Sequence, residues 1–131
     1  MLKTGTVLVV WTVATMFASL PALAADAKAE ITNAAMHAGL AAKAGDIVGV
    51  HTHLHHAVNC LVGPGGEGFD AKEMNPCANS GNGAIADAAN ASTKQALQTA
   101  LAKANSGIAA TDLAAAQKDA SAAEASLKSA K

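Results

Sequence analysis

The 131-residue chain is poor in aromatic residues and contains no arginine. It has no Tyr, two Phe and one Trp, and its nine Lys stand against ten acidic residues, for a formal net charge of −1. Proteins that bind nucleic acids use basic surfaces and commonly stack bases on aromatic side chains. The composition therefore argues against a nucleic-acid partner, and it offers no basic face to an anionic membrane.

Long apolar runs are absent except near the N-terminus. Residues 1–24 combine a basic start, an apolar stretch and a small-x-small site that ends at Ala24. This layout is typical of a secretory signal peptide, whose apolar core is shorter than a membrane-spanning helix. We expect cleavage after Ala24, which would leave residues 25–131 as one exported, periplasmic domain with no membrane insertion after processing. Phe69 would then be the only aromatic residue of the mature chain.

Cysteine is also scarce, since Cys60 and Cys77 are the only two. In an exported chain two cysteines most simply form a disulfide. The chain-entropy model assigns a loop of this length about 3 kcal/mol of stabilisation, which matters for a small core in which alanine dominates. The spacing is not CxxC and no CxxCH occurs, which excludes covalent c-type haem.

Most of the remaining chain carries the apolar spacing of helices. In residues 47–62 apolar side chains recur every three or four positions, a single stripe on a helix. The predicted helices cover residues 26–44, 47–62 and 84–104, and a fourth follows a stop at residues 105–107. We therefore expect an all-α fold, an up-down four-helix bundle of two helical hairpins, with a disulfide-pinned loop over residues 63–83 that Phe69 anchors.

Four of the five histidines lie in one short stretch, HTHLHH at residues 51–56. Each residue of a helix advances by about 100°, so His51 and His55 share one edge of the predicted second helix, one turn apart. His53 and His56 fall toward the opposite border, and the four rings cannot all join one site. An i, i+4 pair of histidines chelates Zn, Cu, Ni or Co, because both imidazoles reach one ion from the same face.

A third ligand must come from another part of the chain. His37 is the natural candidate, because it lies near the turn that joins the first two helices. Further options are Met36, Asp46, Glu67 and Asp70. Local clustering of histidines is typical of metal binding, and we predict a periplasmic buffer, carrier or sensor of a divalent transition metal (Cu, Ni, Zn or Co). The predicted ligands are His51, His55 and His37, with His53 and His56 as further members of the cluster.

Two other functions remain open at this point. Facing imidazoles of a bundle can hold a b-type haem by bis-His ligation, although the lack of aromatic residues argues against a haem pocket. The disulfide-pinned loop, with Gly63-Pro64-Gly65-Gly66 and Phe69, can instead be the recognition surface of a protein-interaction module. An enzyme is not expected, because no Ser or Cys nucleophile has a visible base and the loop glycines lack a phosphate-binding pattern.

The dipeptides His37-Ala38 and His56-Ala57 carry a resemblance to a known family. Together with the turn after Ala41-Ala42-Lys43-Ala44-Gly45, they make residues 31–59 resemble the small metal-binding proteins of the bacterial periplasm. Those proteins are exported, alanine-rich four-helix bundles built from short repeats. The resemblance implies binding of divalent metals, copper foremost, at several sites of low specificity, and it is carried over here to His37 and His56.

Overall fold

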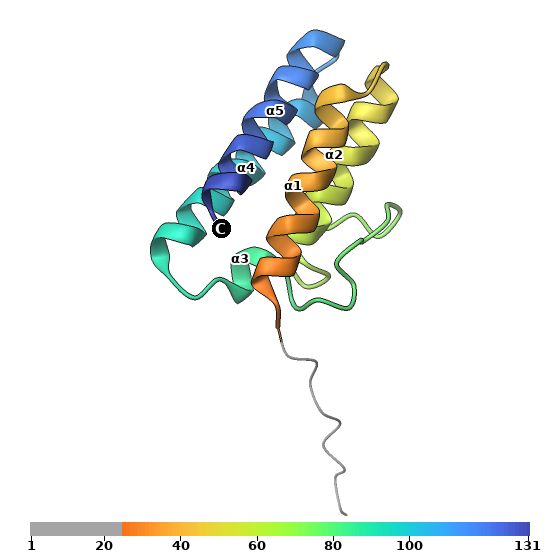
Figure 1. The fold of residues 1–131 in the computed structure, drawn as a ribbon. Helices are drawn as coiled ribbons and strands as arrows, with labels where there is room; N and C mark the ends of the chain where they lie inside the picture. The colour runs from red at the N-terminus through yellow and green to blue at the C-terminus, as the bar shows by residue number, and fades with distance from the viewer. Residues whose placement is uncertain (1–24) are drawn as a thin grey trace, which may run out of the picture.

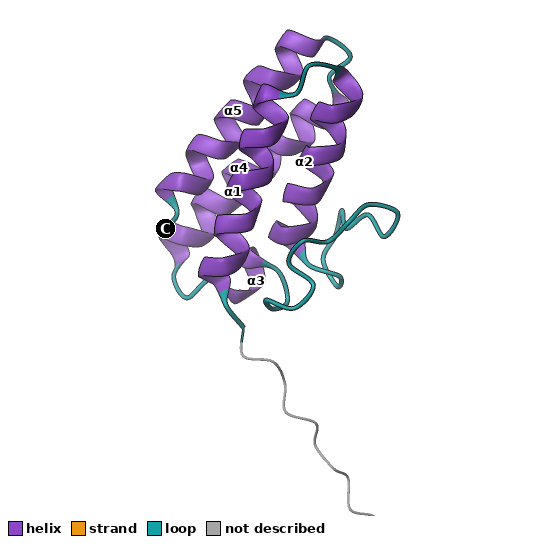
Figure 2. Cartoon of the chain, turned by 45° about the vertical axis from the view of Figure 1, so that its right-hand side comes forward, coloured by secondary structure: helices purple, strands orange, loops and turns teal. Residues whose placement is uncertain are grey.

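The computed structural model describes residues 25–131, and the predicted signal peptide lies outside the described residues (Figure 1). The described part of the chain contains five helices and no strand (Figure 2). They are α1 (Ala27–Lys43), α2 (Ile47–Val62), α3 (Ala84–Asp87), α4 (Ala91–Ala109) and α5 (Leu113–Ser129). None of these helices is both long and apolar enough to cross a membrane.

The four long helices pack side by side. α1 contacts α2 and α5, and α4 contacts α5 and α2, while the short α3 closes one end against α1 and α2. The predicted all-α class is thus confirmed, and the packing is compatible with the predicted up-down bundle of two hairpins.

Each long helix begins at an Asp or Asn whose side chain caps it. A side-chain oxygen at the N-cap accepts a hydrogen bond from the backbone N–H three residues later, which satisfies one of the free donors of the first turn. The four caps are Asp26, Asp46, Asn90 and Asp112, with N···O distances of 2.8–2.9 Å. The predicted start of the second helix at residue 47 is confirmed.

The predicted third helix over residues 84–104 begins at Ala84 as expected, but it is interrupted after its first turn and extends beyond its predicted end. α3 ends at Asp87, because Ala88 has extended backbone angles, and Asn90 starts a separate helix. α4 then continues through the expected stop at residues 105–107 as far as Ala109. Gly107 does not end the helix. It lies inside α4, packed against α2, and a Cβ there would stand 2.6 Å from Leu54 Cδ1.

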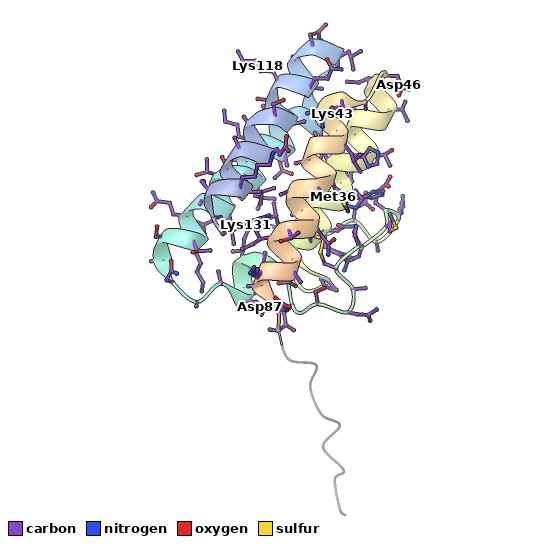
Figure 3. The ribbon with its side chains drawn as sticks, viewed as in Figure 1. Met36, Lys43, Asp46, Asp87, Lys118 and Lys131 are labelled. Carbon is purple, nitrogen blue, oxygen red and sulfur yellow. A yellow bond between two sulfur atoms is a disulfide. The ribbon has the colours of Figure 1, made fainter. Side chains whose placement is uncertain are left out.

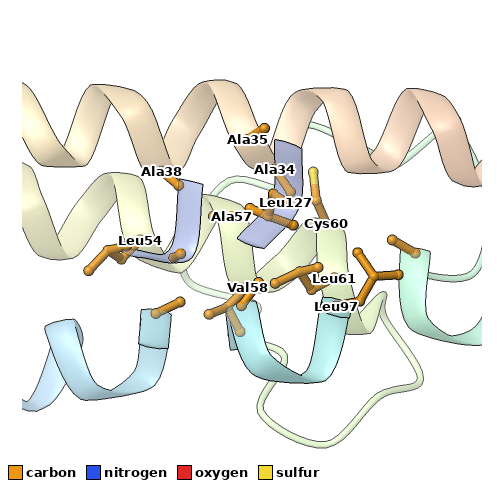
Figure 4. Packing of buried hydrophobic residues seen from close by; sticks show 14 of the residues in the cluster. Ala34, Ala35, Ala38, Leu54, Ala57, Val58, Cys60, Leu61, Leu97 and Leu127 are labelled. Atoms are coloured by element: carbon orange, nitrogen blue, oxygen red, sulfur yellow. The ribbon is translucent and has the colours of Figure 1, made fainter. Parts of the chain in front are cut away.

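The core is a narrow seam of leucines set among alanines (Figure 4). Leu54 and Leu61 of α2 are fully buried with Leu97 of α4 and Leu127 of α5. Small alanine side chains around them let the helix axes approach closely. The apolar stripe predicted for α2 is confirmed, because all of its members except Ile47 are buried. The buried members are Val50, Leu54, Ala57, Val58 and Leu61.

The loop between α2 and α3 is held by a disulfide and by one buried amide. Cys60 and Cys77 form a disulfide as predicted. The Asn59 side chain is fully buried, donates to the carbonyls of Asp70, Glu73 and Met74, and accepts the N–H of Asp70. Phe69 does not anchor the loop as expected, because it stays half-exposed and outside the core cluster. The polar contacts of Asn59 take that role.

A buried carboxyl group ties the start of α1 to the end of this loop. Glu30 is fully buried, and its Oε1 accepts the backbone N–H of Gly83 at 2.9 Å. Its Oε2 has no hydrogen-bond partner among the described residues. Burial, and then the nearby carboxylate of Asp87 (labelled in Figure 3), raise the pKa of Glu30 from 4.5 to about 7, against the lowering effect of the Gly83 hydrogen bond.

Candidate metal centre

The α1–α2 hairpin brings three histidines together from two helices. His37 lies in the middle of α1, and the short turn after Lys43 folds α2 back along it, so that residue 37 comes opposite residue 53. His37 Nδ1 lies 3.3 Å from His53 Nδ1. One ligand nitrogen from each of His37, His53 and His56 lies within 4.8 Å of the other two. We call these three residues the histidine triad.

The distance between the His37 and His53 nitrogens suits a small metal ion. Zinc–imidazole bonds are about 2.0–2.1 Å long, so two nitrogens on one tetrahedral ion lie roughly 3.3 Å apart. The His37–His53 separation already equals this value. The three rings also pack against one another, with centroids 5.1–5.8 Å apart and the His56 ring edge-on to the other two.

Burial keeps two of the three rings neutral. His37 is only 6% exposed and His56 only 7%. Burial, helped by the neighbouring His56 and His53, lowers the pKa of His37 from 6.5 to about 4. Burial also lowers the pKa of His56, although the carboxylate of Glu73 acts in the opposite direction. Metal ions bind unprotonated imidazole, so both rings are in the binding form at neutral pH.

The loop adds a carboxylate to one side of the triad. Glu73 Oε2 lies 3.4 Å from His56 Nε2. The other nitrogen of the same ring, Nδ1, is buried and has no hydrogen-bond partner among residues 25–131. A buried polar atom without a partner is rare in folded proteins and calls for a physical explanation.

The other two histidines of the stretch, His51 and His55, lie outside the triad, which differs from their predicted role as the chelating pair. His51 Nε2 lies 3.0 Å from the carbonyl oxygen of Ala110, the C-cap residue that follows α4. His55 Nδ1 lies 3.7 Å from Asp70 Oδ2 on the loop. The difference arises because α1 packs against the border of α2 that carries His53 and His56, so His37 meets these two rings.

Sequence reasoning missed Glu73, although a signal for it exists. Cys60 lies four residues after His56, and Glu73 lies four residues before Cys77. A disulfide between the two cysteines therefore brings residue 73 toward residue 56. Of the other proposed ligands, Asp70 faces His55 and Met36 is largely exposed.

Comparisons with protein-family models, with curated proteins and with solved structures found no match for this chain. The resemblance to the small periplasmic metal-binding proteins therefore stays a prediction.

Proposed function

We propose that this protein binds one divalent transition metal ion through His37, His53 and His56, and that it serves as a periplasmic metal buffer, carrier or sensor. The convergence of three imidazole nitrogens from two helices within 4.8 Å carries the proposal. Three nitrogen ligands and one open position are a common arrangement for zinc, and imidazole suits copper, nickel and cobalt as well. Calcium and magnesium prefer oxygen ligands.

The packing of the rings favours a bare ion over haem. A bis-His haem places the porphyrin plane between its two axial imidazoles. The three rings of the triad instead touch one another, with His56 edge-on to both of the others. These contacts fill the space that a porphyrin needs.

Two further features support an exported metal-binding bundle. The disulfide between Cys60 and Cys77 is typical of oxidising compartments such as the periplasm. The packing of α1 with α2 and of α4 with α5 is compatible with two hairpins of an up-down bundle, a fold in which metal sites form between facing helices. N-terminal sequencing of the protein from the periplasmic fraction tests the export, and a mature start at Ala25 is the expected result.

The four histidines of α2 provide matched variants for a test of the metal site. Calorimetric titration with Cu(II), Ni(II), Zn(II) and Co(II) should show one ion per wild-type chain. Replacing His53 or His56 by Ala should weaken binding by at least the roughly 10–100-fold that loss of an outer-shell partner costs. His51→Ala and His55→Ala are the matched controls, because their rings lie outside the triad.

Two results would contradict the proposal. One is wild-type affinity no tighter than millimolar for all four ions. The other is equal loss of affinity in the triad variants and in the control variants, since that would assign binding to the histidine-rich stretch as a whole. Elemental analysis of the protein purified from its own compartment would identify the metal.

A further inference from the structure

Glu73 is held beside the triad by two consecutive residues of α2. The buried amide of Asn59 donates to the backbone carbonyl of Glu73 and to those of its neighbours Asp70 and Met74. The next residue of α2 is Cys60, and its disulfide holds the loop at Cys77, four residues after Glu73. A segment without regular structure is thereby attached to the helix one turn from His56, and the position of the Glu73 carboxylate is set by the fold.

The two nitrogens of His56 have different surroundings. Nε2 faces a Glu73 oxygen at 3.4 Å, whereas Nδ1 is buried without a hydrogen-bond partner in the described part of the chain. An ionised carboxylate accepts hydrogen bonds and cannot donate them, so it favours the tautomer with the proton on Nε2. In a neutral ring that tautomer leaves the lone pair on Nδ1.

We propose that Glu73 is a positioning residue of the metal centre: its carboxylate accepts the Nε2 proton of His56 and thereby directs the Nδ1 lone pair of that ring to the ion. This inference rests on the proposed function. Metal-binding histidines commonly donate their second ring N–H to a carboxylate, which fixes the tautomer and raises the basicity of the ligand. Glu73 acts from outside the coordination sphere, because it is not among the residues whose ligand atoms all lie within 4.8 Å of one another.

The test compares two glutamates of the same loop. Glu73→Ala removes the carboxylate next to His56, while Glu67→Ala removes an exposed one and serves as the control. We expect Glu73→Ala to lower the Zn(II) affinity roughly 10–100-fold and Glu67→Ala to leave it within about twofold. Circular dichroism should show the same helix content in both variants, since the Glu73 side chain is about one-third exposed and contributes little to the core.

A second readout reports on the ring directly. Long-range ¹⁵N NMR of the imidazoles distinguishes the two tautomers and the nitrogen that carries the metal. In the metal-free wild type His56 should be protonated at Nε2, with Zn(II) it should coordinate through Nδ1, and in Glu73→Ala the Nε2-protonated form should be less populated. A purely structural role of Glu73 would not change this tautomer ratio.

The outcomes separate this inference from the proposed function. If wild-type protein binds no Zn(II), the metal centre itself is refuted. If Zn(II) binds and His53→Ala abolishes binding, but Glu73→Ala behaves like Glu67→Ala, the centre stands and the role of Glu73 is refuted. Coordination of Zn(II) through Nε2 of His56 would equally overturn it.

Discussion

Replacing Glu30 by Gln should change how the stability of this protein depends on pH. Glu30 is fully buried, and its pKa is raised from 4.5 to about 7. Between these values the folded state holds a proton that the unfolded state has released, so the free energy of unfolding falls as the pH rises through this window. Above pH 7 the folded protein must keep a buried carboxylate next to Asp87, which destabilises it.

The size of the effect follows from the pKa change. One pKa unit corresponds to about 1.4 kcal/mol, so the change from 4.5 to about 7 is worth roughly 3 kcal/mol. Glutamine has nearly the same shape and can still accept the N–H of Gly83 through its Oε1. We expect Glu30→Gln to gain about 3 kcal/mol relative to wild type between pH 4.5 and pH 8.

Urea denaturation in the presence of a chelator measures this difference. Both proteins are unfolded at several pH values from 4.5 to 8, and the free energies of unfolding are subtracted at each pH. The subtraction removes the contributions of titrating groups that do not interact with Glu30, including the histidines. Glu67→Gln, which replaces an exposed glutamate, is the control and should give a constant difference. A constant difference for Glu30→Gln would refute the reasoning that burial governs this carboxyl group.

Three further predictions concern the triad, the disulfide and the packing of α4 against α2. In the presence of a chelator, the free energy of unfolding of His37→Asn should fall less on acidification than that of wild type, by up to roughly 3 kcal/mol. The reason is that the folded His37 ring stays neutral down to about pH 4, whereas the unfolded one takes up a proton near 6.5. Parallel curves of unfolding free energy against pH for wild type and variant would contradict this. Replacing Cys60 and Cys77 by Ala should lower the free energy of unfolding by about 3 kcal/mol in urea and also weaken Zn(II) binding, since Glu73 is no longer held; unchanged affinity would show that the loop is positioned without the disulfide. Gly107→Ala should lower thermal stability by about 1 kcal/mol, because overpacking against Leu54 outweighs the helix propensity of alanine; a rise in melting temperature would contradict the close contact.

Much of the helical architecture could be predicted from local patterns. The 3-4 spacing in α2 identified its extent and its buried face, and the two cysteines predicted the disulfide. The first of these features depends on residues close together in the chain. The disulfide could be predicted because two cysteines allow only one pairing. The extent of α4 could not be predicted, because glycine commonly follows the end of a helix, and the packing of Gly107 against Leu54 of another helix is not visible in the local sequence.

The membership of the histidine triad shows the same division between local and tertiary information. That the histidines concentrate in residues 51–56 is a property of the sequence, and it was sufficient to predict metal binding as a hypothesis. Which of them converge was not, because a helix presents its residues in all directions and several pairs of rings are possible on one turn. The choice of His53 and His56 over His51 and His55 depends on the side of α2 against which α1 packs.

Local periodicity and composition were thus sufficient to predict the helical class, the buried stripe of α2 and a candidate site made of histidines. The members of the triad and the place of Glu73 beside it came from contacts between segments that are far apart in the chain, His37 with His53 and His56 with Glu73. The physical reason is that the angle of a residue on its helix is a local quantity. The distance between rings on different helices is instead set by the packing of whole helices. The position of the loop beside them is set by the disulfide.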